Sequence, residues 1–293
     1  MIKFPPKKIL VAYDLSDVSR MAWRHAAALA AISGAALEVV YVEPWQAGVD
    51  LMPPPDLIPS HARALRVKIR AALGDGPKIT ILQGDPALRI LSLARLHRPD
   101  LIVVGTHGRK GLKLALLGSV AEAVVRGAPV PVLVARGPVR PIRSILAPVN
   151  FTPYSEYGFA YAAAASAVLS ARLTALHVTD DPVWSGNLRF RLFALIKRLP
   201  AKIINNCRPT AETSVGEAVK GILEARRGHD WIVLVAHEKS LIKDAFFGTT
   251  LERVLRSSSI PVLSVPAPRH VPFALRTSGS GSYARQRSSV TLI

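Results

Sequence analysis

The sequence has few of the features that mark a secreted or membrane-embedded chain. Only one cysteine, Cys207, occurs in 293 residues, so an internal disulfide framework is excluded and a reducing compartment is expected. The longest stretch without a charged side chain, residues 157–171, is rich in alanine and too short to cross a bilayer. No secretory signal precedes the first apolar run. We therefore expect a cytoplasmic protein.

Acidic side chains are also scarce. The chain has 20 acidic and 38 basic residues, which gives a formal net charge of +18. Such an excess suits nucleic acid or an anionic membrane surface, but the basic residues are spread over the whole chain, as solvated faces would be. Two clusters lie in predicted helices: Arg63, Arg66, Lys68 and Arg70 in the first half, and Arg189, Arg191, Lys197 and Arg198 in the second. Both interpretations remain open.

Hydrophobic residues make up 49% of the chain and charged residues 20%, a balance typical of globular proteins. Apolar, often β-branched runs alternate with helical patterns, as in parallel sheets built from βαβ units. In the first half we predict strands at 9–13, 37–42, 78–83, 101–104 and 130–135. The predicted helices run from Ser16 or Asp17 to Gly34, over 61–73, from Pro86 to 97 and over 119–126, with a loop at 44–58.

After a Gly/Pro-containing linker at 136–141 the same order of patterns begins again. Residues 143–150 repeat 7–14, 173–178 repeat 37–42, 215–218 repeat the turn at Gly84, 230–237 repeat 100–107 and 260–265 repeat 130–134. The chain is therefore interpreted as an internal duplication, with domains at 1–138 and 139–268. Residues 269–293 are Gly/Ser-rich and basic and are predicted to form a disordered tail.

One stretch of the first half carries a glycine pattern typical of phosphate binding. A buried strand ends at Val104 and Gly105, Gly108 follows, and after nine residues Gly118-Ser119 opens a helix. Glycine allows close approach of a phosphate to the backbone, and the N–H groups at a helix start attract anions. Because parallel strands present their carboxyl ends at one edge, Asp14, Val42 and Gly105 can converge there.

This Gly-x2-Gly-x9-Gly-Ser pattern, together with the duplication, resembles a tandem universal stress protein. The resemblance implies two Rossmann-like, adenine nucleotide alpha hydrolase-like domains, each a five-stranded parallel sheet with helices on both faces. It also implies an ATP site in the first domain. Asp14 would contact the nucleoside, while Ala12, Tyr13 and Val42 would flank adenine. The phosphates would lie at the end of the strand and in the loop, at Val104, Gly105, His107, Gly108, Gly118, Ser119 and Val120. Mg²⁺ would arrive with the nucleotide.

Each of these residues also has an ordinary structural explanation. Asp14 is a suitable helix cap, and glycines are common turn residues. His107 stands where the family uses main chain, so we assign no catalytic residue and no metal ligand. Arg109 and Lys110, with Lys113, either assist the phosphates or are solvated loop charges.

The second half departs from the pattern. Asn150 replaces Asp14, Val235 replaces Gly105 and Glu238 replaces Gly108, whereas Gly248-Thr249 keeps the last element. We expect Val235 to crowd the loop and Glu238 to repel a triphosphate. This half is therefore predicted to be a structural partner or to hold a different ligand.

Three functions remain open at this point. The resemblance favours an ATP-binding regulatory module of the stress response. A slow ATPase or a nucleotidyl- or phosphoryl-transfer enzyme is the second, and a basic nucleic-acid or membrane-surface protein is the third. Family domains pair through their last strands, so we also expect the strands at 130–134 and 262–265 to form an internal pseudo-dimer, with a homodimer of whole chains as an alternative.

Overall fold

The computed structural model describes residues 2–44, 57–106, 117–181, 185–236 and 250–267. The chain divides into two compact units. The first, Pro5–Val139, is called the first domain below. The second domain comprises the described residues from Arg140 onward together with the first residues of the chain, because the Tyr161 ring packs edge-on against Phe4.

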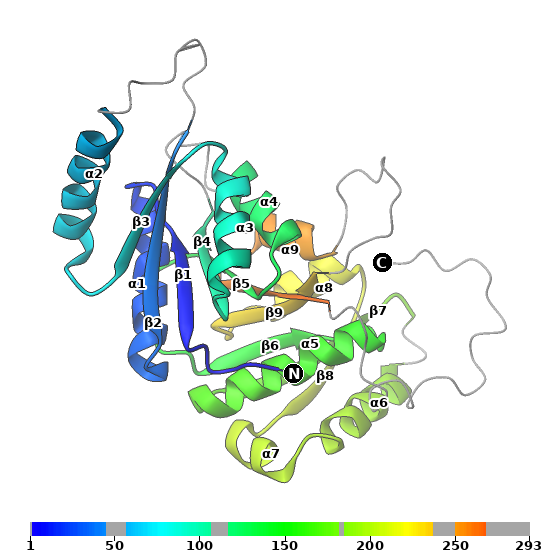
Figure 1. The fold of residues 1–293 in the computed structure, drawn as a ribbon. Helices are drawn as coiled ribbons and strands as arrows, with labels where there is room; N and C mark the ends of the chain where they lie inside the picture. Colours follow the sequence, from blue (N-terminus) through cyan, green and yellow to red (C-terminus); the bar gives the residue numbers. More distant parts are fainter. Residues whose placement is uncertain (1, 45–56, 107–116, 182–184, 237–249, 268–293) are drawn as a thin grey trace. The chain divides into compact units, whose positions relative to one another are not determined.

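The first domain is a five-stranded parallel sheet in the order β3-β2-β1-β4-β5 (Figure 1). Its elements are β1 (Lys8–Ala12), α1 (Asp17–Ser33), β2 (Ala36–Glu43), α2 (Leu57–Leu73), β3 (Lys78–Gln83), α3 (Pro86–His97), β4 (Leu101–Gly105), α4 (Ser119–Gly127) and β5 (Val132–Ala135).

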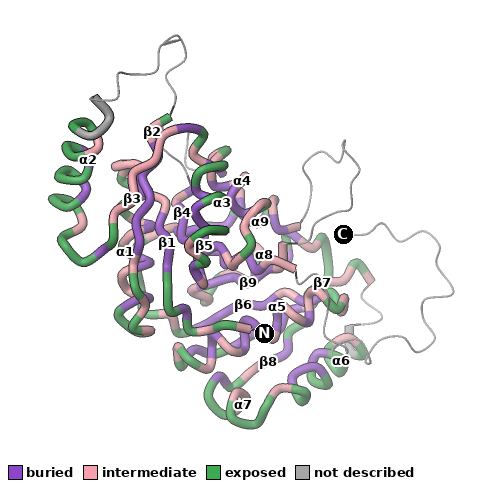
Figure 2. Tube along the Cα trace, in the orientation of Figure 1, coloured by how far each residue is buried: buried purple, intermediate pink, exposed green. Residues whose placement is uncertain are grey.

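Crossover direction decides which helices share a face. Parallel connections are right-handed, and α1 and α2 lead across the sheet in one direction while α3 and α4 lead in the other. The two pairs therefore lie on opposite faces, and α3 packs directly on α4. The central strands are largely buried, and most exposed residues lie on the helices and in the connecting segments (Figure 2).

Local sequence explains where the helices begin and end. The Ser16 hydroxyl accepts from the Ser19 N–H at the start of α1, and Gly34, with φ 67°, ends it in the left-handed region. The Asp85 carboxylate caps α3 through the Leu88 N–H, with proline at the first helical position. These boundaries were predicted, and they are confirmed; of the two N-cap candidates for α1, Ser16 is the cap.

The second domain repeats the architecture in the order β10-β9-β6-β7-β8. Its elements are β6 (Ser144–Pro148), α5 (Pro153–Leu169), β7 (Arg172–Thr179), α6 (Ser185–Lys197), α7 (Ala201–Cys207), β8 (Thr210–Val215), α8 (Ala218–Ala225), β9 (Trp231–Ala236), α9 (Thr250–Ser257) and β10 (Val262–Pro266). The predicted fold class, two tandem α/β domains with parallel sheets, is confirmed.

Two details differ from the prediction. Helix α2 begins at Leu57, inside the segment 44–58 that its prolines marked as a loop. The second domain has an additional short helix, α7, which packs on α5 and whose buried Cys207 ends it. Burial raises the pKa of the Cys207 thiol to about 11, so this side chain is a neutral, small apolar group at neutral pH. Among the described helices, none has the length and apolar character needed to cross a membrane.

In each domain, an aspartate carboxylate accepts two backbone hydrogen bonds and so joins the starts of two strands. The Asp100 carboxylate accepts from the N–H groups of Lys7 and Lys8, at 2.9 and 3.1 Å. Its counterpart Asp230 accepts from Arg143 and Ser144, at 2.7 and 3.0 Å. These aspartates precede β4 and β9, so the repeated Asp before each apolar run sets the register of the central strand pair.

A buried polar cluster at the amino edge distinguishes the first domain from the second. The Glu38 carboxylate, only 5% exposed, accepts from the Thr80 hydroxyl at 2.7 Å, lies 2.9 Å from His97 Nδ1 and pairs with Lys78 Nζ at 3.2 Å. Burial alone would raise the pKa of this carboxyl, but the bonds from Thr80, His97 and Lys78 together hold it below its usual value.

The second domain keeps the histidine and replaces the carboxylate by a hydroxyl. His229 Nε2 lies 3.0 Å from the Thr174 hydroxyl, which stands in the place of Glu38. The ionised cluster is therefore a property of the first domain, and its loss should be measurable there.

We predict that Glu38→Gln lowers the free energy of unfolding by about 2 kcal/mol at neutral pH, because the charge-assisted bonds are lost. Since the folded-state pKa is depressed, this contribution is fully present above the usual value of 4.5 and disappears as the pH falls through the lower folded-state pKa. Denaturant unfolding between about pH 3 and 8 measures this loss of stability, because the range brackets the titration of the Glu38 carboxyl. Asp75→Asn, at an exposed pair 3.8 Å from Arg70, is the control and should change little.

Candidate functional site

The carboxyl edge of the first sheet brings the ends of its central strands together. Ala12 ends β1, Val42 lies near the end of β2 and Gly105 ends β4. The register pairs Ala12 with Val40 and Gly105 with Ala135, so these ends lie on neighbouring strands. Ligands of open α/β sheets bind beyond this edge.

The chain leaves β1 through a tight turn organised by Asp14. Its Oδ1 accepts from the Ser16 N–H at 3.1 Å and from the Ser16 hydroxyl at 2.5 Å, and the Asp14 N–H donates to the Ser19 hydroxyl at 3.2 Å. Leu15 takes φ 68°, an unusual value for a residue with a branched side chain. Asp14 therefore does not cap α1 itself; it holds Ser16, which does.

Packing against α1 explains why residue 105 is a glycine. A Cβ at this position would lie 2.7 Å from Val18 Cγ1 and 3.0 Å from the Val18 carbonyl oxygen. The first turn of α1 thus rests directly on the end of β4. A ligand is not needed to explain this glycine.

The two described residues Thr106 and Gly118, between β4 and α4, are hydrogen-bonded to each other. The Gly118 N–H donates to the Thr106 carbonyl at 2.5 Å, which fixes the start of α4 beside the end of β4. Helices α1, α3, α5 and α8 have side-chain caps, whereas Gly118 supplies none for α4. The N–H groups of the first turn of α4 point along the helix axis without such a cap, which suits an anion.

The predicted site residues differ in accessibility. Tyr13, Val42 and Val104 are 3%, 7% and 2% exposed, so their side chains belong to the core, and burial raises the pKa of the Tyr13 hydroxyl. Ala12, Asp14, Gly105, Gly118 and Val120 are partly exposed, and Ser119 is exposed. His107, Gly108, Arg109, Lys110 and Lys113 lie outside the described residues.

The sequence analysis did not identify two further groups at this edge. Thr106 anchors Gly118, as described above. Arg136 directly follows the Ala135 that pairs with Gly105, and burial lowers the pKa of its guanidinium. We did not predict Arg136 as a site residue because we assigned it to the linker. The apolar strand that ends immediately before it could have indicated its position at the carboxyl edge.

The second domain preserves the turn and removes its charge. Asn150 Oδ1 accepts from the Thr152 N–H at 3.2 Å and from the Thr152 hydroxyl at 2.7 Å, and the Asn150 N–H donates to the Ser155 hydroxyl at 3.2 Å. Phe151 repeats the positive φ, at 58°. Asparagine thus performs the structural task of Asp14 without a carboxylate.

Val235 packs against the helix beside it, and the loop that we expected it to crowd lies outside the described residues. Gly158 of α5 leaves room for it: a Cβ on Gly158 would lie 2.5 Å from Val235 Cγ2. The valine side chain therefore occupies the interface between β9 and α5. Glu238, Gly248 and Thr249 lie outside the described residues.

An aromatic and basic cluster occupies this part of the second domain. The Arg191 guanidinium carbon lies 4.0 Å from the centroid of the Phe151 ring, and that ring lies 4.7 Å from His177. His177 Nδ1 is 2.7 Å from the Val149 carbonyl oxygen. Burial lowers the pKa of His177 despite that bond, and the nearby Arg191 lowers it further.

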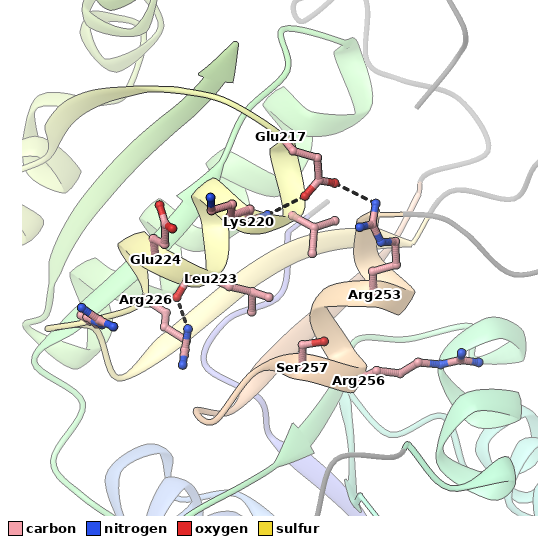
Figure 3. Close-up of a pocket in the computed structure, with 10 residues that line it drawn as sticks. Glu217, Lys220, Leu223, Glu224, Arg226, Arg253, Arg256 and Ser257 are labelled. Carbon is pink, nitrogen blue, oxygen red and sulfur yellow. Dashed lines mark hydrogen bonds and ion pairs between the residues drawn. The ribbon is translucent and has the colours of Figure 1, made fainter. Parts of the chain in front are cut away.

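A groove between α8 and α9 is rich in charge (Figure 3). Arg253 Nη1 donates to Glu217 at 2.7 Å, and the same carboxylate caps α8. In Figure 3 Arg256 extends away from α8 and Glu224 away from α9, so the charged side chains do not meet at one point. We assign this groove no ligand. Within the described ranges, no three His, Cys, Asp or Glu side chains are grouped as a metal site.

Comparison with known proteins gives a consistent result. A family model described as the universal stress protein family matches residues 5–136 and again 141–266. A universal stress protein of Methanocaldococcus jannaschii is 36% identical over 143 residues, which cover 45% of this chain and 83% of that protein. One from Thermus aquaticus is 39% identical over 137 residues, 44% of this chain and 98% of that protein. A solved universal stress protein from Archaeoglobus fulgidus, 19% identical, has the same fold with a TM-score of 0.70 and covers 90% of this chain and 99% of that one.

We predict that Gly105→Val destabilises the protein without any ligand, by about 1–3 kcal/mol, because the new side chain collides with α1. Denaturant unfolding of the ligand-free variant tests this. Gly76→Ala is the control, since nothing lies within 4 Å of a Cβ there. Unchanged stability of Gly105→Val would show that this glycine has no packing role.

Proposed function

The chain belongs to the universal stress protein family, and from that premise we propose that it is an ATP-binding regulatory module of the stress response. The first domain binds the nucleotide. The second domain is a structural partner or accepts a different ligand. The protein acts by binding, and Mg²⁺ accompanies the nucleotide.

The observation that carries this proposal is the bond between Gly118 and Thr106. It holds the start of α4, which lacks a side-chain cap, beside the end of β4. Backbone N–H groups at such a helix start, with the Ser119 hydroxyl, are suitable donors to phosphate oxygens. A helix start fixed in advance costs little further ordering on binding.

The remaining groups at this edge complement a nucleoside. The Asp14 carboxylate is a negatively charged acceptor at this edge, and a carboxylate can accept from ribose hydroxyls. Ala12, which is partly exposed, supplies apolar surface for a purine. Arg136, close to the end of β4, adds positive charge near the phosphates.

The difference between the domains also supports the assignment of ATP to the first. Asn150 keeps the backbone turn of Asp14 but is a weaker acceptor, because it carries no charge. Both domains keep the turn, which is structural, but only the first domain has a carboxylate in it.

We predict one ATP site per chain, with Asp14→Asn weakening it about 10- to 100-fold. The variant loses charge-assisted bonds to the nucleoside, and Asn150 shows that asparagine maintains the turn. Calorimetric titration with ATP and Mg²⁺ measures both quantities, and a circular dichroism spectrum confirms folding.

Two further variants complete the experiment. Asn150→Asp should leave the affinity and the number of sites unchanged. Gly108→Glu, which copies the second domain, should abolish binding. Two sites in the wild-type protein, or none, would contradict the proposal. Phosphate release well above background that Asp14→Ala abolishes would assign the protein to the enzymes.

A further inference from the structure

Helix α6 exposes aromatic side chains on the side opposite its core contacts. Leu192, Leu195 and Ile196 are buried, at 0%, 6% and 6% exposure, against the strands of the second domain. Phe190 and Phe193 are 73% and 41% exposed. Helix α6 lies at the outside of this domain, and its outward side is exposed in Figure 2. Two exposed phenylalanines one turn apart are an unfavourable arrangement in water.

The exposed face has an apolar centre and a basic border. At about 100° per residue, Phe190 points opposite the buried face, with Phe193 about 60° to one side. Arg189 and Arg191 lie about 100° to either side of Phe190, and Lys197 lies about 20° from it, two turns along. All three basic residues are exposed.

Each arginine contacts an aromatic ring. The Arg189 guanidinium carbon lies 5.8 Å from the centroid of the Phe193 ring, and that of Arg191 lies 4.0 Å from the Phe151 ring. Their positive charges are thus kept at the borders of the aromatic face.

The corresponding helix of the first domain provides an internal comparison. Helix α2 also joins the second and third strands of its domain, and Arg63, Arg66 and Arg70 are exposed on it. Among the described side chains of α2, the exposed large hydrophobic residue is Val67, at 63%, and its sequence contains no Phe, Tyr or Trp. Both helices are basic, and only α6 adds the phenylalanines.

We propose that the outward face of α6 docks on an anionic lipid surface. Phe190 and Phe193 enter the region between head groups and acyl chains, while Arg189 and Arg191 contact the head-group phosphates on either side and Lys197 contacts them two turns along the helix. An apolar centre between basic borders suits an interface whose charge lies at the surface and whose apolar part lies beneath. The net charge of +18 attracts the chain toward such a surface from a distance.

This inference is independent of nucleotide binding, because all of its residues lie in the second domain. Co-sedimentation of the full chain with vesicles tests it, using equal parts phosphatidylcholine and phosphatidylglycerol. We predict binding to these vesicles and weak binding to phosphatidylcholine alone. Phe190→Ser combined with Phe193→Ser should weaken binding at least about tenfold, and Val67→Ser on α2 should have no effect. Circular dichroism establishes that each variant is folded.

Insertion has a separate readout. Phe190→Trp should retain vesicle affinity and add a fluorescence component that shifts to the blue on binding. Equal binding of the wild type and the double phenylalanine variant would overturn the proposal. So would an equal loss on replacing Arg63 and Arg66 of α2 by glutamate, which would indicate attraction by overall charge alone. Loss of RNA binding in the phenylalanine variant, with no vesicle binding by the wild type, would also overturn it.

Discussion

The short turn from the first strand into the first helix is the interaction on which each domain depends. In the first domain, Asp14 holds Ser16, Ser16 begins α1, and α1 then places Val18 directly on Gly105. The end of β4 is thereby fixed, and the bond between Thr106 and Gly118 places the start of α4 beside it. The contact between Asp14 and Ser16 therefore determines, through the position of α1, the arrangement of the edge at which parallel sheets bind ligands.

The duplication separates structural requirements from chemical ones within a single chain. The turn is retained with either a carboxylate or an amide, including its positive φ at Leu15 and Phe151. The contact between helix and strand is retained with the small residue on either partner: Gly105 on the strand of the first domain, Gly158 on the helix of the second. At two matching positions the domains differ in charge. Asp14 and Glu38 of the first domain have the neutral counterparts Asn150 and Thr174 in the second.

Local patterns were sufficient to predict most elements, because their causes are local. Period-two and period-3.6 hydrophobicity, the Asp85-Pro86 helix start and the left-handed Gly34 all act within a few residues. The prolines around the start of α2 misled its placement: Pro59 lies in the first turn of the helix, where a proline is acceptable. Helix α7 carries too weak a pattern to be recognised, and its position follows from packing on α5.

Residue patterns alone were enough to predict the duplication, the parallel sheets, the strand ends that form the candidate site and the absence of an Asp14 counterpart from the second half. The roles of Gly105 and Val235 could be seen only in the tertiary structure, because each contacts a helix 77 or more residues away in the chain. The same is true of Arg136: the pairing of Ala135 with Gly105 places it at the edge of the candidate site, although the sequence pattern assigned it to a linker. The side of α6 that faces outward is also set by the tertiary structure. Periodicity predicts that a helix has an apolar face, but only packing shows which apolar residues remain outside the core.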